Sequence, residues 1–252
     1  MTPSKVPPQQ SSFFQEPRWL ETHYQSQGYT LIVGVDEAGR GPLAGPVVAA
    51  SAVLPTDHTL EGLDDSKKLT EKQRDDLFHQ IHDQALALGV GVVSAAEIDQ
   101  LNILQASLKA MRLSLDQLRK KMTGTPDIVL VDGNQSFESD LKIVPVVKGD
   151  SRSQNIAAAS IVAKVLRDRI MVAYDSLYPS FGFAKHKGYP TPTHKQTVLE
   201  LGPTPVHRLS FRGVLPPTEE TPPADETVKE TLPPSPKKKT KRKAKSKRSK
   251  KS

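Results

Sequence analysis

Short apolar runs alternate with amphipathic segments between about residue 19 and residue 201. The run at residues 31–35 is rich in β-branched residues and stops at turn formers, which predicts a buried strand. Runs at residues 47–54 and 89–95 predict two more strands. Two others, within "PDIVLVDG" and "KIVPVVKGD", end at Asp132 and Asp150. Strands that alternate with helical segments indicate an α/β fold.

The polar and apolar spacing between these runs is that of helices. Residues 70–86 repeat an apolar side chain every fourth position, with Thr70 as the predicted N-cap. Residues 96–121 predict one long amphipathic helix. Its apolar face consists of Ile98, Leu101, Leu104, Leu108, Met111, Leu115 and Leu118. Shorter helices are expected around residues 19–24 and 193–201.

A further helix follows Asp150, and its start leaves two interpretations open. Its apolar face consists of Ile156, Ala159, Ala163, Leu166 and Ile170. Ser151 and Gln154 have the spacing of a capping box, which would leave the Asp150 carboxylate for another role. Alternatively, Asp150 is itself the cap.

Charge and composition divide the chain into three parts. The net charge of +7 lies entirely in residues 216–252, which hold 12 Lys and Arg against 5 Asp and Glu. Residues 1–215 carry 23 of each sign. Residues 1–15, rich in Pro, Gln and Ser, and residues 216–252 are predicted to be disordered, flanking a folded domain at residues 16–215.

Other compositional features exclude several classes of protein. The chain has no cysteine, so it forms no disulfide and no thiolate metal site. No apolar stretch approaches the roughly 18 residues of a membrane span, and the N-terminus lacks the pattern of a secretory signal. These features fit a cytoplasmic protein.

Carboxylates end three of the predicted strands. Asp36 and Glu37 follow the first apolar run, as Asp132 and Asp150 follow two later ones. Ligand sites in open α/β sheets lie beyond the carboxyl ends of the strands, so the four acids can converge if the strands are neighbours. Their mutual repulsion would be relieved by Mg²⁺ or Mn²⁺, which prefer carboxylate oxygens. Oxygen ligands and a phosphate substrate point to two-metal phosphodiester hydrolysis.

Two considerations bear on this cluster. Neighbouring strand residues point to opposite faces, so we expect Asp36 and Glu37 to share a site only if the strand ends there, which the following Ala38 and Gly39 permit. Ordinary surface turns are the alternative interpretation for residues 36–37 and 132–134.

Several motifs occur together and in a specific order. They are "GVDEAGRGPLAGPVVAA", "DDSKKL", "VDG", "KGD", "AAASIVAKVLRDR", "HKGY" and "HRLSF". In this order the chain resembles ribonuclease HII, the type 2 ribonuclease H, over about residues 19–211. The resemblance implies a ribonuclease H-like mixed sheet flanked by helices, with a C-terminal helical extension. It also implies an endonuclease dependent on Mn²⁺ or Mg²⁺, with two ions when substrate is bound.

The substrates implied are RNA–DNA hybrids and DNA duplexes with single embedded ribonucleotides, cut to leave 5′-phosphate and 3′-hydroxyl ends. By the resemblance, Asp36, Glu37 and Asp132 match metal ligands, and Asp150 matches a fourth acidic residue. Gly39, Arg40 and Gly41 match a loop whose main chain reads the ribose 2′-hydroxyl, and Tyr189 matches a ring that stacks on the next sugar. Only glycine lets a main chain approach a nucleotide so closely.

The helix after Asp150 supplies three more candidate substrate contacts. Ser160, Lys164 and Arg167 are interpreted as phosphate contacts, with a solvated helix face as the alternative. Asp168 is expected to pair with Lys164 at i,i+4. The polar loop "DDSKKL" either faces DNA or braces its own loop. His186, His194 and His207 are expected to form local hydrogen bonds rather than bind metal.

The tail and the function each leave alternatives. The eleven basic residues between positions 237 and 251 either contact nucleic acid non-specifically or only solubilise the chain. A ribonucleotide-specific endonuclease, active as a monomer, is the leading interpretation. The alternatives are a non-catalytic nucleic-acid-binding protein and the type 3 ribonuclease H, whose usual folded N-terminal domain has little room in the roughly 30 residues before the first strand.

Overall fold

The computed structural model describes residues 19–63, 66 and 69–215. The two segments predicted to be disordered, residues 1–15 and 216–252, lie outside the described residues. The centre of the fold is a five-stranded sheet in the order β3-β2-β1-β4-β5. Its strands are β1 (Ile32–Ala38), β2 (Val47–Val53), β3 (Ala87–Val93), β4 (Ile128–Asp132) and β5 (Ile143–Val146).

The sheet is mixed, as the resemblance implied. β1 pairs antiparallel with β2 and parallel with β4, while β2 with β3 is antiparallel and β4 with β5 is parallel. β1 and β4 therefore run in the same direction as neighbours, and their carboxyl ends lie at the same edge of the sheet. Both strands are buried throughout their apolar parts, which agrees with helices covering both faces.

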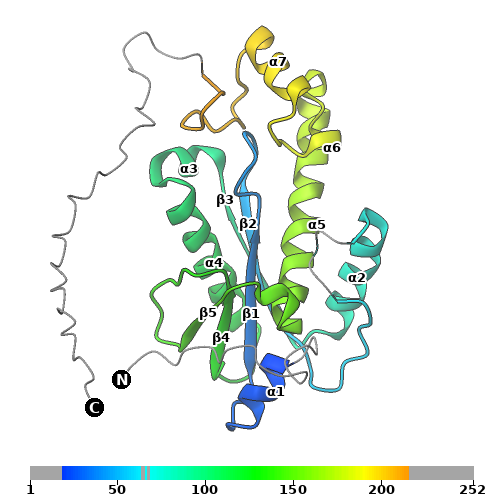
Figure 1. Ribbon diagram of the computed structural model, residues 1–252, viewed down its shortest axis with the longest axis vertical. Helices are drawn as coiled ribbons and strands as arrows, with labels where there is room; N and C mark the ends of the chain where they lie inside the picture. Colours follow the sequence, from blue (N-terminus) through cyan, green and yellow to red (C-terminus); the bar gives the residue numbers. More distant parts are fainter. Residues whose placement is uncertain (1–18, 64–65, 67–68, 216–252) are drawn as a thin grey trace, which may run out of the picture. The chain divides into compact units, whose positions relative to one another are not determined.

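Helices lie on the two faces of the sheet (Figure 1). α4 (Ile103–Arg119) packs on β1, β2 and β3, and α5 (Gln154–Leu177) packs on β1, β2 and β4 from the opposite side. α2 (Glu71–Gln84) packs on α5 with Leu77 and Ile81 buried, and Thr70 caps it as predicted. α1 (Trp19–Gln25) covers the start of β1 and β4 through its own apolar cluster.

The helix predicted over residues 96–121 is two helices, so that prediction is wrong. α3 (Ala95–Leu101) ends and α4 begins at Asn102, which has φ +68°. The Asn102 side chain accepts a hydrogen bond from the Gln105 amide and so caps the second helix. Apolar periodicity did not reveal the break, because Ile98 and Leu115 are buried on both sides of it.

Small residues, rather than the predicted leucines, form the closest part of the α4 interface. Leu101, Leu104 and Leu108 are exposed or only partly buried, whereas Ala106, Ala110 and Ser114 are buried. A Cβ atom on Gly91 of β3 would lie 2.0 Å from the carbonyl oxygen of Ala110. The helix backbone therefore lies directly on the strand, which leaves the longer side chains at the margin.

The cap of α5 also differs from the prediction. The helix begins at Gln154, and the side chain of Ser153, not Ser151, accepts from the Ile156 amide. Asp150 lies in a short 3₁₀ turn, η2 (Gly149–Ser151), four residues after the end of β5. It is therefore neither the cap of α5 nor the last residue of a strand.

The chain beyond α5 forms the expected C-terminal helical extension. It consists of η3 (Pro179–Phe181), α6 (Phe183–His186) and α7 (Pro192–Leu201), which pack on α5 or on one another. Residues 202–215 then return to the loop between β1 and β2, where Ala44 and His207 form an isolated bridge. Among the described helices, none combines the length and the apolar character needed to cross a membrane.

Candidate active site

Asp36 and Asp132 lie side by side at the sheet edge. The parallel ladder between β1 and β4 ends at the pair Val35 and Val131, and each carboxylate is the next residue. Ile32, Gly34 and Asp36 share the face that α5 covers, since strand residues alternate between faces. Gly34 leaves the space for this helix, because a Cβ there would lie 2.1 Å from the Asn155 backbone.

Glu37 lines the same cavity as Asp36 and lies next to the last residue of β1. The strand predicted at residues 31–35 is too short, because β1 continues to Ala38, paired with β2. It ends at Ala38, directly after Glu37, which agrees with the expectation that the strand ends at the two acids. Beyond Val35, β1 no longer pairs with β4, which leaves a gap beside the end of β1. The side chains of Asp36 and Glu37 can both reach this gap, although they leave the strand on opposite faces. Glu37 there forms an ion pair with Arg40 at 3.3 Å.

One cavity of about 210 Å³ collects most of the predicted site residues. It is lined by Asp36, Glu37, Ala38, Gly39, Arg40, Gly41, Ser66, Asp132, Ser160, Lys164, Arg167 and Tyr189. These residues come from β1, β4, α5 and three loops. Asp150 is the one predicted acid that does not line it.

Burial and mutual repulsion disfavour the ionised forms of the two β1 acids. Burial raises the pKa of Asp36 well above its ordinary value, and the nearby Glu37 and Asp132 carboxylates raise it further. Burial also raises the pKa of Glu37, which the Arg40 guanidinium partly offsets. The cavity therefore concentrates negative charge that a cation would stabilise.

Asp132 is linked to the turn that carries Asp150. Its Oδ1 accepts from the Gly149 amide at 2.7 Å. Asp150 Oδ1 in turn accepts from the following Ser151 amide at 2.9 Å. Asp150 thus lies one residue from the Asp132 contact but outside the cavity lining.

The donor set suits a hard divalent cation, although it is not arranged as a complete ligand cage. Within the described residues, no three His, Asp or Glu side chains form a group ready to hold a metal ion. Carboxylate oxygens from Asp36, Glu37 and Asp132 nevertheless line one cavity, where burial and repulsion leave their charge undercompensated. Oxygen ligands of this kind match Mg²⁺ or Mn²⁺, which retain several waters.

The loop after β1 brings main chain to the cavity. Gly39 has φ +100°, and a Cβ there would lie 2.0 Å from Arg167 Nε, so a side chain has neither the conformation nor the space. Arg40 is half exposed. Gly41 lies against the Tyr189 ring, 3.7 Å from an added Cβ to ring atom Cε1. Tyr189 is 43% exposed and lines the cavity, so it forms part of the cavity wall and not of the core.

Of the three predicted contacts on α5, all of which line the cavity, Ser160 and Lys164 have their polar groups in different surroundings. Ser160 is buried, forms a hydrogen bond with Asp36 and lies 3.0 Å from the Ser66 hydroxyl. Lys164 pairs with Asp168 at 2.8 Å, which confirms the expected i,i+4 pair. Both lysine and serine line the cavity, and their phosphate contacts stay a prediction.

The structure gives Arg167 a position that the prediction of a phosphate contact did not anticipate. It is 1% exposed, and its guanidinium donates to the carbonyl oxygens of Pro46, Lys187 and Ala44 at 3.1–3.2 Å. These bonds brace the loops that border the cavity.

The polar loop and the histidines behave as structural elements. Ser66 is buried and its carbonyl accepts a hydrogen bond from Arg74, which favours the interpretation that this loop braces itself. Residues 64, 65, 67 and 68 of the same loop lie outside the described residues. His186, His194 and His207 form local hydrogen bonds, as expected. Arg208 was not among the residues predicted from the sequence, although it is buried and donates to the loop after β1. The "HRLSF" motif was the signal that could have indicated it.

Comparisons with known proteins point in one direction. The family model described as "Ribonuclease HII" matches residues 33–214. The ribonuclease HII of Geobacter sulfurreducens is 53% identical over 195 residues, which is 77% of this chain and 88% of that protein. The crystal structure of ribonuclease H2 from Pyrococcus horikoshii matches with a TM-score of 0.59 and 29% identity, over 73% of this chain and 94% of that one. A crystal structure of Bst ribonuclease HIII in complex with Mn²⁺ matches with a TM-score of 0.56 and 19% identity, over 79% of this chain and 72% of that one, a likeness of fold alone.

Proposed function

Because this chain belongs to the ribonuclease HII family and is a ribonuclease H enzyme, we propose that it cuts nucleic acid at ribonucleotides through the cavity at the end of β1. The substrates are RNA–DNA hybrids and DNA duplexes that contain single ribonucleotides. The products carry 5′-phosphate and 3′-hydroxyl ends. We further propose that it acts as a monomer in the cytoplasm, in the removal of ribonucleotides during replication and repair.

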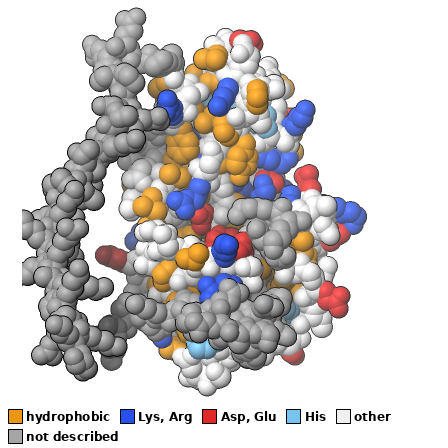
Figure 2. All heavy atoms as spheres, in the orientation of Figure 1, with side chains coloured by type: hydrophobic (Ala, Val, Ile, Leu, Met, Phe, Trp, Pro, Cys, Tyr) orange, Lys and Arg blue, Asp and Glu red, His pale blue; other side chains and the backbone are white. Residues whose placement is uncertain are grey.

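One observation carries this proposal: a single cavity combines three carboxylates, a glycine-rich loop and a half-exposed tyrosine ring. A binding protein would have little use for the acids, because carboxylates repel phosphates unless a cation intervenes. Lys and Arg side chains border the acidic ones near the middle of the face in Figure 2, as a polyanionic substrate requires. The combination therefore favours catalysis over binding alone.

The acids are the proposed metal ligands. Asp36, Glu37 and Asp132 would hold the ions, and Asp150, on the adjacent turn, would act as the fourth acid. When bound, two divalent ions supply an activated water and stabilise the charge that develops on the leaving 3′-oxygen. The protein's part is to hold the carboxylates in place. Asp132 is oriented by the Gly149 amide, and Asp36 by the Glu37 amide at 2.7 Å and by Ser160.

The glycine-rich loop and Tyr189 are the proposed readers of the sugars. The loop main chain at Gly39, Arg40 and Gly41 lies where it can bond a ribose 2′-hydroxyl, the group that separates RNA from DNA. The Tyr189 ring adjoins Gly41 and is exposed on the cavity side. It would stack on the sugar that follows the ribonucleotide.

Asp132→Asn tests the catalytic assignment. Asparagine keeps the oxygen that accepts from Gly149, so the variant should fold with an unchanged melting temperature. Its kcat/KM for a duplex with one embedded ribonucleotide should fall at least about a hundredfold, as expected for the loss of an interaction made mainly in the transition state. Mn²⁺ should raise the melting temperature of the wild type but not of this variant, because the ion binds only the folded site.

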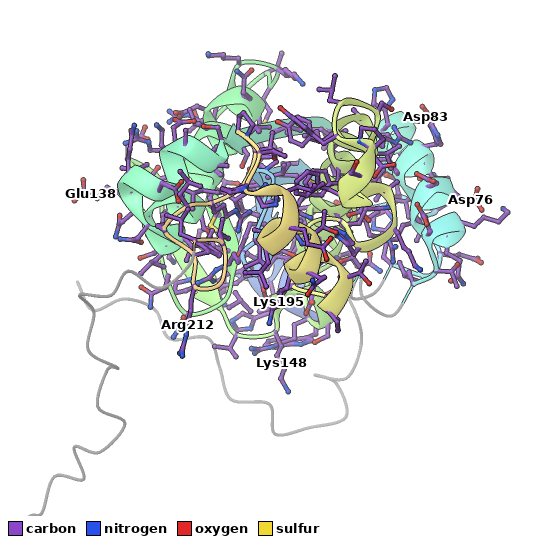
Figure 3. All side chains as sticks on the ribbon, turned by 90° about the horizontal axis from the view of Figure 1, so that it is seen from above. Asp76, Asp83, Glu138, Lys148, Lys195 and Arg212 are labelled. Atoms are coloured by element: carbon purple, nitrogen blue, oxygen red, sulfur yellow. The ribbon has the colours of Figure 1, made fainter. Side chains whose placement is uncertain are left out.

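The matched control is Asp76→Asn, since Asp76 lies exposed on α2 and points away from the body (Figure 3). This control should cleave at the wild-type rate. An all-DNA duplex should remain uncut by every protein. Wild-type turnover by Asp132→Asn would remove Asp132 from the site, and binding of the ribonucleotide duplex without cleavage by the wild type would favour the non-catalytic alternative.

A further inference from the structure

Buried polar side chains support both groups that are proposed to recognise the sugars, the glycine-rich loop and Tyr189. The glycine-rich loop follows β1, whereas Tyr189 lies about 150 residues later, between α6 and α7. Residues 204–211 contact the loop directly and reach Tyr189 through His194. Two consecutive residues of this segment, His207 and Arg208, are 2% and 0% exposed, respectively.

Arg208 holds the loop after β1. Its Nη1 donates to the Arg40 carbonyl at 3.0 Å, and its Nη2 donates to the Gly39 carbonyl at 2.5 Å. Its Nε donates to the Gly45 carbonyl at 3.0 Å. A buried guanidinium is costly unless such bonds compensate it, and only a planar fork can reach several carbonyls at once.

These bonds fix the direction of the loop's amide groups. A trans peptide is planar, with its C=O and N–H on opposite sides. Because the carbonyls of Gly39 and Arg40 point inward to Arg208, the amides of Arg40 and Gly41 point away from it, and both residues line the cavity. Arg208 thus orients the donors that would meet a nucleotide.

His207 reaches Tyr189 through His194. The Nδ1 of His194 lies 2.9 Å from the Tyr189 carbonyl, which can only accept, so this nitrogen carries the proton. The two Nε2 atoms of His194 and His207 lie 3.0 Å apart. The Thr204 amide donates to Nδ1 of His207 at 2.9 Å, so His207 carries its proton on Nε2 and donates it to His194. Each partner thus fixes the tautomer of the next ring, and the relay ends at Tyr189.

Main-chain bonds join the same three segments. The Leu43 amide donates to the Gly188 carbonyl, and the Arg208 amide donates to the Leu43 carbonyl, both at 2.8 Å. The Gly45 amide donates to the Val206 carbonyl at 2.8 Å. On its other side the segment is fixed to α3, where Asp99 accepts from the amides of Leu209 and Ser210 at 2.9 Å.

We propose that His207 and Arg208 act as one positioning unit, which sets the Tyr189 ring and the glycine-rich loop at the spacing needed to recognise a ribonucleotide followed by a deoxyribonucleotide. This inference rests on the function proposed above. Neither residue touches the substrate. His207 acts through His194 and Tyr189, and Arg208 acts through the loop.

Two amide substitutions separate positioning from general stability. In His207→Gln, the side-chain amide nitrogen lies near the place of Nε2 and can still donate to His194. In His207→Asn, the amide oxygen lies near the place of Nδ1 and can accept from Thr204, but the donor to His194 is lost. The measured quantity is the preference: kcat/KM on a duplex with one embedded ribonucleotide divided by kcat/KM on an RNA–DNA hybrid.

We expect His207→Gln to keep the preference within about twofold and His207→Asn to lower it roughly tenfold, since small misplacements of a recognition group have effects of this order. In the Tyr189→Ala background, His207→Asn should lower the preference no further, because residues that act through one group are not additive. His82→Asn, an exposed histidine on α2, is the control and should match the wild type.

Arg208→Lys tests the second arm. Lysine keeps the charge but lacks the fork, so kcat/KM should fall roughly tenfold or more on both substrates, because the loop reads the ribose in each. Arg212→Lys is the matched control, since Arg212 is exposed and points away from the body in Figure 3. A wild-type rate for Arg208→Lys overturns this arm.

The remaining outcomes distinguish a failure of the positioning unit from a failure of the proposed function. If Tyr189→Ala lowers the preference but His207→Asn does not, the positioning unit is wrong and the proposed function stands. The same holds if His207→Asn lowers the melting temperature and slows both substrates equally. If Tyr189→Ala itself leaves the preference unchanged, the tyrosine's role in the proposed function fails, and this inference fails with it.

Discussion

Tyr189 has a ring that is nearly half exposed while its main chain is held on both sides. Its amide donates to the His186 carbonyl, and its own carbonyl accepts from His194. The ring is therefore oriented by backbone contacts rather than by burial. A side chain presented in this way is suited to stacking on a sugar or base.

This geometry separates two substitutions at Tyr189. Tyr189→Phe keeps the ring face and should retain most activity. In Tyr189→Ala, kcat/KM should fall roughly ten- to two-hundredfold, taking base–aromatic stacking of about 1–3 kcal/mol as a guide. The loss should be greatest where a deoxyribonucleotide follows the ribonucleotide. Cleavage of the two substrates and thermal melts measure this, and a large drop in melting temperature with equal slowing of both substrates would contradict it.

The lowered pKa of His207 leads to a second prediction, which concerns how the free energy of unfolding depends on pH. Burial and the neighbouring rings of His194 and His186 lower the pKa of His207 to about 4. The unfolded chain would take up this proton near pH 6.5, whereas the folded chain resists it until about pH 4. The unfolded state therefore binds more protons in this window, and stability falls as the pH falls through it.

The expected loss from His207 alone approaches roughly 3 kcal/mol between pH 7 and pH 4. Urea unfolding of the wild type and His207→Gln at these two pH values measures it, because the variant cannot titrate at this position. The wild type should lose more stability than the variant on acidification. Equal losses would show that His207 is not held neutral by its surroundings.

The acids that line the cavity could be predicted from the sequence, whereas the residues that support the site could not. Asp36 and Asp132 end apolar runs, and the strand rule placed them at one sheet edge. Arg208 could not be predicted in the same way, because its partners are carbonyls of residues more than 160 positions away, a contact that no local pattern encodes. The buried position of Arg167 was not predicted for the same reason, since its partners too are main-chain carbonyls of distant segments.

At the scale of elements, apolar periodicity predicted the helices but not where they break. Asn102 combines φ +68° with ψ +163°, a region that glycine alone adopts readily. Its side chain also caps α4. The break between α3 and α4 therefore depends on one polar residue, which a hydrophobic pattern does not register.

Substitutions at Asn102 test this account. Asn102→Gly loses the cap but relieves the backbone, so its stability should stay within about 0.5 kcal/mol of the wild type. Asn102→Ala loses the cap and keeps the strain, and it should be less stable than the glycine variant by about 1–2 kcal/mol. Urea midpoints at unchanged m-value measure the difference. Equal stabilities for Ala and Gly would show that the backbone conformation carries no cost.

At the scale of the whole molecule, the segments that complete the site are far apart in sequence. β1 and β4 bring the acids, the turn at Gly149 orients one of them, and residues 186–208 hold the loop and the tyrosine. The mixed sheet and the helical extension could be expected from the motif order, but the buried contacts that align these segments emerge only from the packed fold.

The basic tail gives the last prediction. Residues 216–252 lie outside the described residues and carry the whole net charge of +7. If they contact phosphates, deleting them should weaken duplex binding and flatten its dependence on salt, because each contact contributes roughly 0.9 to the log–log slope. The melting temperature and the cut position should not change. A chain of full length with the eleven basic residues at 237–251 replaced by Gln separates charge from length, and it should bind as the deletion does. An unchanged slope in both proteins would mean that the tail contacts no nucleic acid and serves solubility instead.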